Sequence, residues 1–241
     1  MTGIPQADLC PLTNDDGIKD LHLDIMQPSL QGCVYVIGDD PSVRNELGSL
    51  LRLLGYAVRL FSDPVLFLER IPLYQPAVVI LDMVMQQMSG LEVQSRLASI
   101  KALSAVVIFI SDNSDWSQIV QGIKAGAHDF LGKPVSRDEI ADAVDKAMAR
   151  SIVRTARLTT LRGWLDSISQ LSARERQIFD FMLSGYMNQQ IAIKLNIRAD
   201  TVKKHRAVIC EKFQVSGTPD LIILSRLAEI EFGLANADLV K

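Results

Sequence analysis

Short apolar runs alternate with amphipathic segments through the first part of the chain. Residues 33–37, 77–81 and 105–110 are apolar at nearly every position, which is typical of strands buried on both faces of a parallel sheet. Residues 57–61 and 129–131 are shorter strand candidates. Helical spacing of apolar residues fills the intervals, over 41–54, 64–71, 90–100, 115–125 and from about 136. The alternation predicts an α/β fold, a doubly wound, flavodoxin-like parallel sheet of five strands over residues 32–148.

The pattern changes on either side of this region. Residues 1–31 mix prolines with scattered acidic residues and are predicted to be a mobile N-terminal extension. The last helix of the sheet domain continues through residues 149–170 as a predicted helical linker. Residues 171–241 contain only short helical segments, so the second domain is predicted to be all-α.

Composition narrows the class of protein. A chain of 241 residues with 48% hydrophobic and 22% charged residues is globular, and its net charge of −3 excludes a uniformly basic nucleic-acid coat. Cys10, Cys33 and Cys210 form no CxxC pair and are interpreted as reduced, buried residues. No stretch has the length or character of a leader or a membrane span, so we expect a cytoplasmic protein. No GxSxG, P-loop, GxGxxG or HExxH motif is present, and we expect no conventional enzyme.

Polar residues follow the predicted strands where a doubly wound sheet binds its ligands. Asp39 and Asp40 follow the first strand, Asp82 follows the apolar run 77–81, Ser111 follows 105–110, and Lys133-Pro134 follow the last strand. Crowded carboxylates repel one another unless a cation lies between them. Mg²⁺ is the natural cation, because it accepts one or two carboxylates and keeps several waters.

These residues, with Leu81-Asp82-Met83, Met88-Ser89-Gly90 and the run from Asp129 to Pro134, resemble the receiver domain of two-component response regulators. The resemblance implies that Asp82 is the phosphoacceptor and that Lys133 and Ser111 bind the phosphoryl oxygens. It implies that Asp39, Asp82 and the backbone carbonyl of Val84 hold Mg²⁺, with Asp40 as a further candidate. Phe130 would be a switch residue that turns inward with Ser111, and Pro134 would fix the turn of Lys133 through a cis peptide bond.

Two positions depart from the family pattern. The family usually has an acidic residue where this chain has Gly38, and a proline where it has Gln86. The missing acidic residue at position 38 and the missing proline at position 86 are both expected to affect how strongly the site binds its metal.

In the second domain, Leu171 to Glu175, Asn188 to Ala192, Leu195 to Ile197 and Thr201 to His205 resemble the helix-turn-helix of the LuxR/FixJ class. Ser172 and Glu175 form a predicted capping box. At 100° per residue, the helix after Asp200 buries Val202, Ile209 and Phe213. Its outward face carries Lys203, Lys204, Ala207 and Glu211, of which the lysines suit guanine edges. Thr201, His205 and Arg206 are predicted to contact phosphates, and this segment is locally basic.

This domain also departs from its family. Arg198 replaces the usual serine before the recognition helix, which predicts that Asp200 is the N-cap. Gln190 replaces a usual glutamate. In the fourth helix, Leu221, Leu224 and Leu227 are candidates for a dimer surface.

The sequence therefore predicts a transcriptional regulator that is phosphorylated on Asp82 by a sensor histidine kinase and binds promoter double-stranded DNA. A homodimer formed on activation is expected, and RNA polymerase is a candidate partner. The alternative is a degenerate receiver, in a DNA-binding or adaptor protein that works without phosphorylation.

Overall fold

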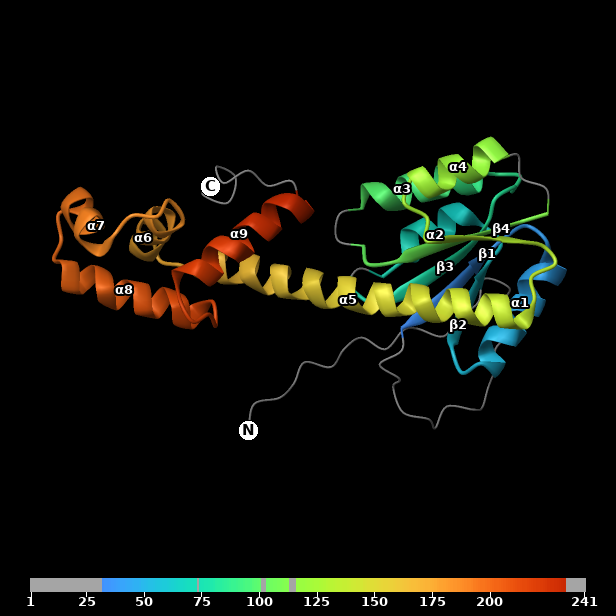
Figure 1. Cartoon of the computed structure of the whole chain (residues 1–241), viewed down its shortest axis with the longest axis horizontal. Helices are drawn as coiled ribbons and strands as arrows, with labels where there is room; N and C mark the ends of the chain where they lie inside the picture. The colour runs from blue at the N-terminus through green and yellow to red at the C-terminus, as the bar shows by residue number, and fades with distance from the viewer. Residues whose placement is uncertain (1–31, 73, 101–102, 113–115, 233–241) are drawn as a thin grey trace. The chain divides into compact units, whose positions relative to one another are not determined.

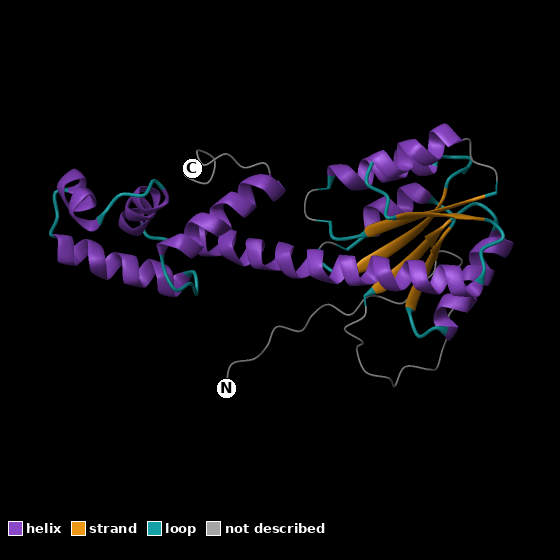
Figure 2. Ribbon diagram, in the orientation of Figure 1, coloured by secondary structure: helices purple, strands orange, loops and turns teal. Residues whose placement is uncertain are grey.

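The computed structural model describes residues 32–72, 74–100, 103–112 and 116–232. The predicted extension over 1–31 lies outside the described residues, as does Asp115 at the expected start of one helix. The chain forms two compact units, with the boundary between Thr155 and Ala156. Figure 2 shows that one unit is α/β and the other all-α, as the alternation of apolar runs predicts.

The first unit contains a five-stranded parallel sheet, as expected. Its strands are β1 (Cys33–Ile37), β2 (Ala57–Phe61), β3 (Ala77–Asp82), β4 (Val106–Ser111) and β5 (Asp129–Gly132). Their order is β2-β1-β3-β4-β5. Ile37 is in register with Leu81, Asp82 with Ile110, and Ser111 with Gly132. Because parallel strands end at the same edge, this register brings the polar residues after β1, β3, β4 and β5 together.

Helices cover both faces of this sheet (Figure 1). They are α1 (Pro41–Leu53), α2 (Pro64–Arg70), α3 (Gly90–Ser99), α4 (Trp116–Lys124) and the first half of α5 (Arg137–Ser169). Side-chain oxygens cap three of them: Asp40 accepts from Ser42 N, Asp63 from Val65 N and Leu66 N, and Ser89 from Glu92 N. The caps Asp40 and Asp63 follow the ends of β1 and β2 by three and two residues, whereas Ser89 follows the end of β3 by seven and leaves a longer loop after Asp82.

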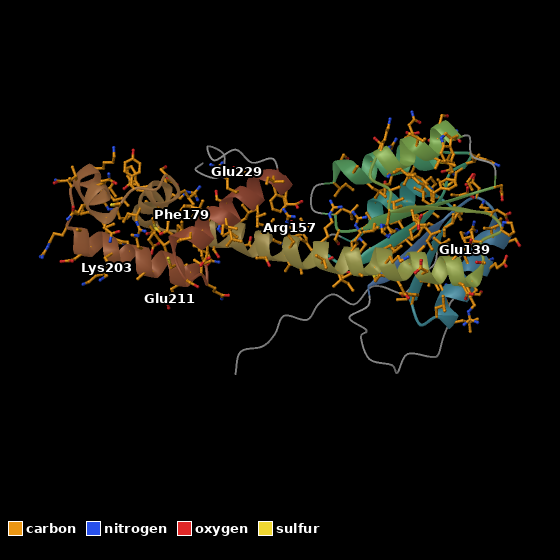
Figure 3. The ribbon with its side chains drawn as sticks, viewed as in Figure 1. Glu139, Arg157, Phe179, Lys203, Glu211 and Glu229 are labelled. Carbon is orange, nitrogen blue, oxygen red and sulfur yellow. The ribbon has the colours of Figure 1, made fainter. Side chains whose placement is uncertain are left out.

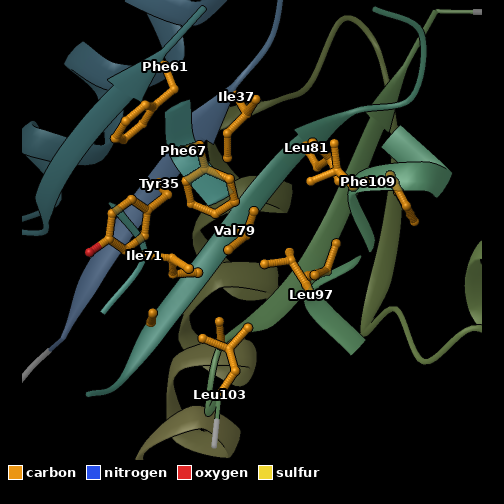
Figure 4. Packing of buried hydrophobic residues seen from close by; sticks show 14 of the residues in the cluster. Tyr35, Ile37, Phe61, Phe67, Ile71, Val79, Leu81, Leu97, Leu103 and Phe109 are labelled. Carbon is orange, nitrogen blue, oxygen red and sulfur yellow. The ribbon is translucent and has the colours of Figure 1, made fainter. Parts of the chain in front are cut away.

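Alternate side chains of each strand enter separate cores. Val36, Ile80 and Ile108 pack with α1 and α5, whereas Tyr35, Val79 and Phe109 pack with α2 and α3. Figure 4 shows the second of these cores, in which Phe61 and Phe67 lie beside Tyr35. Burial on both faces explains why the strands read as continuous apolar runs.

The second unit contains the end of α5 and the helices α6 (Ala173–Leu183), α7 (Asn188–Leu195), α8 (Ala199–Lys212) and α9 (Thr218–Phe232). Its core is aromatic: the Phe179 and Phe213 rings stack with centroids 5.1 Å apart, and Trp164 lies 6.0–6.2 Å from both. The Ser172–Glu175 capping box begins α6, as predicted.

Helix α5 continues without interruption to Ser169, as its sequence predicts. The predicted linker residues are not simply solvated. Ser151 Oγ accepts from Ala77 N at 2.8 Å and donates to Ser104 O at 2.9 Å, and Leu158 and Leu161 are buried. Among the described residues, no helix is long and apolar enough to cross a membrane.

The dimer surface expected on the fourth helix is not an exposed one. Leu221 is fully buried, and Leu224 and Leu227 are partly buried against the core of their own unit. They are needed for that core because α9 packs on α6. The exposed large apolar residues of α9 are Ile223 and Ile230.

Candidate phosphoacceptor site and DNA interface

Asp82 is the last residue of β3 and lies at the polar edge of the sheet. Its side chain and that of Lys133 are each 9% exposed, and Lys133 Nζ donates to Asp82 Oδ2 at 2.6 Å. A strand end places the carboxylate, and the turn after β5 places the ammonium. Together they form a nearly buried ion pair at the point where the sheet winding reverses.

The loop after Asp82 contacts both acidic residues expected to bind the metal. Val84 N donates to Asp82 Oδ1 at 3.2 Å, and Gln86 N donates to Asp39 Oδ2. The second contact joins the end of β1 to the β3–α3 loop. A proline at position 86 has no N–H and could not make it.

The other predicted residues of this edge occupy adjacent positions. Ser111 is buried at the end of β4, and Lys133 N donates to its carbonyl at 2.8 Å. The Lys133–Pro134 peptide bond is cis, as expected. Phe130 is half-buried and packs against the core that contains Phe109.

Asp40 and Gly38 flank Asp39 and differ in what they offer the site. Asp40 Oδ1 accepts from Ser42 N at 2.8 Å, so this exposed carboxylate caps α1. A Cβ atom added to Gly38 would lie 3.4 Å from Asp82 Cβ and 3.6 Å from Asp82 Oδ2. An acidic side chain at position 38 would therefore face Asp82, and this chain lacks it.

Two charged residues of this edge were not predicted from the sequence. Asp112 Oδ2 lies 3.5 Å from Lys133 Nζ. Arg44 is 5% exposed, and its Nη1 donates to Gly38 O at 2.7 Å and to Asp39 O at 3.4 Å. Arg44 shares the buried stripe of α1 with Leu47 and Leu51, a helical phase that the sequence contains.

These charges set the protonation of Lys133. Burial is the largest influence and lowers the pKa of its ammonium group. The hydrogen bond and charge of Asp82, with a smaller contribution from Asp112, outweigh burial and raise the pKa above its ordinary value. Lys133 is thus a fixed cation at neutral pH.

The oxygen atoms here suit a magnesium ion. Asp39 and Asp82 supply two carboxylates whose positions are fixed by backbone N–H groups of one loop. Within the described residues, no group of three or more His, Cys, Asp or Glu side chains is placed to hold a metal. Two carboxylates completed by a carbonyl and waters fit Mg²⁺, which keeps much of its hydration.

The recognition helix α8 has the faces that its sequence predicts. Val202, Ile209 and Phe213 are buried, and Lys203, Lys204, Ala207 and Glu211 are exposed. Figure 3 shows Lys203 and Glu211 on the side of α8 away from Phe179. Thr201 and His205 lie half-buried at the margins.

Two basic residues of this segment have partners inside the unit. Arg206 Nη1 donates to Tyr186 O at 3.2 Å, and its Nη2 donates to Thr218 Oγ1 at 2.6 Å. Lys212 Nζ lies 2.7 Å from Glu175 Oε2. Arg206 thus connects α8 to the turn before α7 and to the start of α9, in addition to the phosphate contact predicted for it.

The start of α8 differs from the prediction. Its N-cap is Arg198, which makes no side-chain cap, and Asp200 lies within the first turn. The N-cap assignment to Asp200 was wrong because the helix begins two residues earlier than the cap chemistry suggests. At α7, Gln190 Oε1 accepts from Met187 N at 2.8 Å, so glutamine performs the capping that a glutamate would.

The chain matches the family "Response regulator receiver domain" over residues 34–145 and "Bacterial regulatory proteins, luxR family" over 169–225. It is 35% identical to the response regulator protein TmoT of Ectopseudomonas mendocina, over 80% of this chain and 87% of TmoT. The chain belongs to the response regulators.

Other relatives agree with this membership. The tetrathionate response regulatory protein TtrR of Salmonella typhimurium is 35% identical over 78% of this chain and 89% of TtrR. FixJ of Rhizobium meliloti, a transcriptional regulatory protein, is 30% identical over 78% of this chain and 92% of FixJ. The solved structure of response regulator StyR matches with a TM-score of 0.64 and 36% identity, over 80% of this chain and 98% of StyR. The response regulator therefore combines a receiver with a LuxR-type helix-turn-helix, as the sequence motifs indicate.

Proposed function

We propose that this response regulator takes a phosphoryl group on Asp82 from a sensor histidine kinase and then binds promoter DNA through α8. The nearly buried Asp82–Lys133 pair at the end of β3 carries the proposal. We assign residues 32–148 to the receiver, 149–170 to a helical linker and 171–241 to the DNA-binding domain. The protein acts in the cytoplasm, where promoter DNA lies.

Phosphoryl transfer needs a carboxylate nucleophile and compensation for the charge that arrives. An Asp82 oxygen attacks the phosphorus atom of the donor, and the bond between that phosphorus and the donor nitrogen or oxygen breaks. An acyl phosphate then remains on Asp82. Lys133, already 2.6 Å from the carboxylate, pairs with the incoming phosphoryl oxygens. Ser111, at the end of the neighbouring strand β4, donates its hydroxyl to them, and Phe130 turns inward as Ser111 moves.

Asp39, Asp82 and the carbonyl of Val84 are the residues that would hold Mg²⁺. The ion would supply charge neutralisation between the carboxylates and the phosphoryl oxygens. We leave Asp40 out of this set because its carboxylate caps α1.

The direct test is labelling with a small phosphodonor or a phosphorylated kinase in the presence of Mg²⁺. Asp82→Asn should abolish the label while circular dichroism shows an intact fold. Asp40→Asn is the matched control, since asparagine still caps a helix and labelling should persist. A label retained by Asp82→Asn would refute the site.

The activated form is proposed to be a homodimer, because one helix-turn-helix makes few base contacts and paired half-sites are read by two copies. A phosphoryl mimic on Asp82 should shift monomers toward dimers in ultracentrifugation and favour whole over halved operators. RNA polymerase would be contacted once the dimer is on the promoter. If neither oligomeric state nor operator preference responds to the mimic, the phosphorylation-independent reading is favoured instead.

A further inference from the structure

The recognition helix begins without a side-chain cap. At its N-cap, Arg198 has an extended backbone with φ −76° and ψ 144°, a conformation in which serine, threonine or aspartate accepts a hydrogen bond from the first turn. Arginine has no acceptor atom and makes no such bond. Helix stability therefore does not account for the residue at this position.

The Arg198 side chain is directed to solvent beside a single carboxylate. It is 86% exposed, and its Nη2 lies 3.7 Å from Oδ2 of Asp200, which is 81% exposed. Ion pairs this exposed add little to stability. In the part of the chain that the structure describes, the guanidinium has no second partner, so most of its five N–H donors are available.

The pair lies at the reading end of the helix. Asp200 precedes Lys203 and Lys204 by three and four residues, so all three share the exposed face of α8. In helix-turn-helix proteins the N-terminal residues of the recognition helix contact base edges. A carboxylate alone would be repelled by phosphates at this point, whereas one that orients a guanidinium is neutralised.

We propose that Arg198, oriented by Asp200, donates two hydrogen bonds to O6 and N7 of a guanine and sets the base preference at one position of the DNA site. The planar fork of arginine fits both acceptors at once, whereas lysine at the same place would carry the charge without the fork and make a weaker contact. This inference rests on the proposed DNA-binding function and assigns one of its specificity determinants.

The test is selection of binding sites from a randomised pool of duplex DNA by the full chain with a phosphoryl mimic. The wild-type protein should select a guanine that Arg198→Lys selects less strongly. On duplexes that differ only there, the wild-type preference should be about 5- to 150-fold, and Arg198→Lys should lower it several-fold. Asp200→Asn should weaken the same preference alone. Arg226→Lys, which changes an exposed arginine of α9, is the matched control and should select as the wild type does.

A second variant separates base reading from folding. Arg198→Ser restores a helix cap, so it should raise the thermal stability while it removes the guanine preference. A uniform loss on all sequences, with a salt slope lower by about one unit and unchanged base preference, would make Arg198 a phosphate contact and overturn the proposal. Unchanged selection by Arg198→Lys would overturn it as well. If the wild-type chain selected no DNA at all, the proposed function itself would fail.

Discussion

The ion pair between Glu175 and Lys212 is expected to stabilise the DNA-binding unit in a pH-dependent way. Lys212 Nζ lies 2.7 Å from Glu175 Oε2, and Ser172 N donates to the same oxygen at 2.8 Å. The hydrogen bond from Lys212 is the larger cause and that from Ser172 the next, and they lower the pKa of Glu175 from 4.5 to about 2. The Glu175 side chain is 10% exposed and that of Lys212 is 32% exposed, so solvent screens the pair in part.

The size of the effect follows from proton linkage. A depressed folded-state pKa stabilises the protein above the unfolded pKa, near 4.5, and the stabilisation is lost as the pH falls through 2. A shift of this size corresponds to about 3 kcal/mol at pH 7 and about 1 kcal/mol at pH 3. Glu175→Gln keeps an acceptor for Ser172 N but removes the charge, so it should cost about 2–3 kcal/mol at pH 7 and much less at pH 3.

Urea unfolding followed by Trp164 fluorescence measures this difference. Trp164 is buried against Phe179 and Phe213, whereas Trp116 of the receiver is 75% exposed and can be replaced by phenylalanine to leave a single reporter. Asp200→Asn, which breaks an exposed pair in the same unit, is the control and should cost under about 1 kcal/mol. A Glu175→Gln loss of equal size at pH 7 and pH 3 would refute the charge-based explanation.

Three further changes test single contacts. Gly38→Asp places a carboxylate against Asp82 and should tighten Mg²⁺ binding about tenfold by calorimetry; unchanged affinity would mean the added acid does not reach the ion. Gln86→Pro removes the N–H that binds Asp39 and should cost the receiver about 1 kcal/mol net in chemical denaturation, since the lost hydrogen bond exceeds the entropic gain of proline; a more stable variant would contradict this. Arg206→Ala breaks the bonds to Tyr186 and Thr218 and should destabilise the DNA-binding unit by about 2 kcal/mol in Trp164-monitored melts. An unchanged melting temperature would mean that Arg206 does not stabilise the unit and that DNA contact is its only role.

The sequence predicts the elements well because their signals are local. The runs at 33–37 and 77–81 are apolar on both faces, and Asp63 and Ser172 cap the helices that follow them. Such patterns depend on neighbours within a few residues, and the parallel topology follows once strands and helices alternate. The same reasoning places Asp82 and Lys133 at one edge, where the structure joins them.

Pairings between distant side chains could not be predicted in this way. Asp112 near Lys133, Arg206 on Thr218 and Lys212 on Glu175 depend on how helices and loops pack. The helical phase predicts that Lys203 and Lys204 are exposed, but it does not show which other cations of this segment have internal partners. Only the packed unit shows that Arg206 and Lys212 do.

The departures from the family pattern have different structural consequences. Gln190 still caps its helix through Met187 N, so it keeps the function of the residue it replaces. Gln86 supplies an N–H to Asp39 that the usual proline lacks, and Gly38 leaves an acidic side chain missing on the other flank of Asp39. Without an acidic residue at position 38, the site keeps Asp39 and Asp82, both of which accept hydrogen bonds from the loop after β3. Position 38 faces Asp82 and Gln86 binds Asp39, so the two changes act on the same candidate metal site, and Gly38→Asp combined with Gln86→Pro should give a change in Mg²⁺ affinity that differs from the sum of the single variants. Additive effects would show that the two positions are independent.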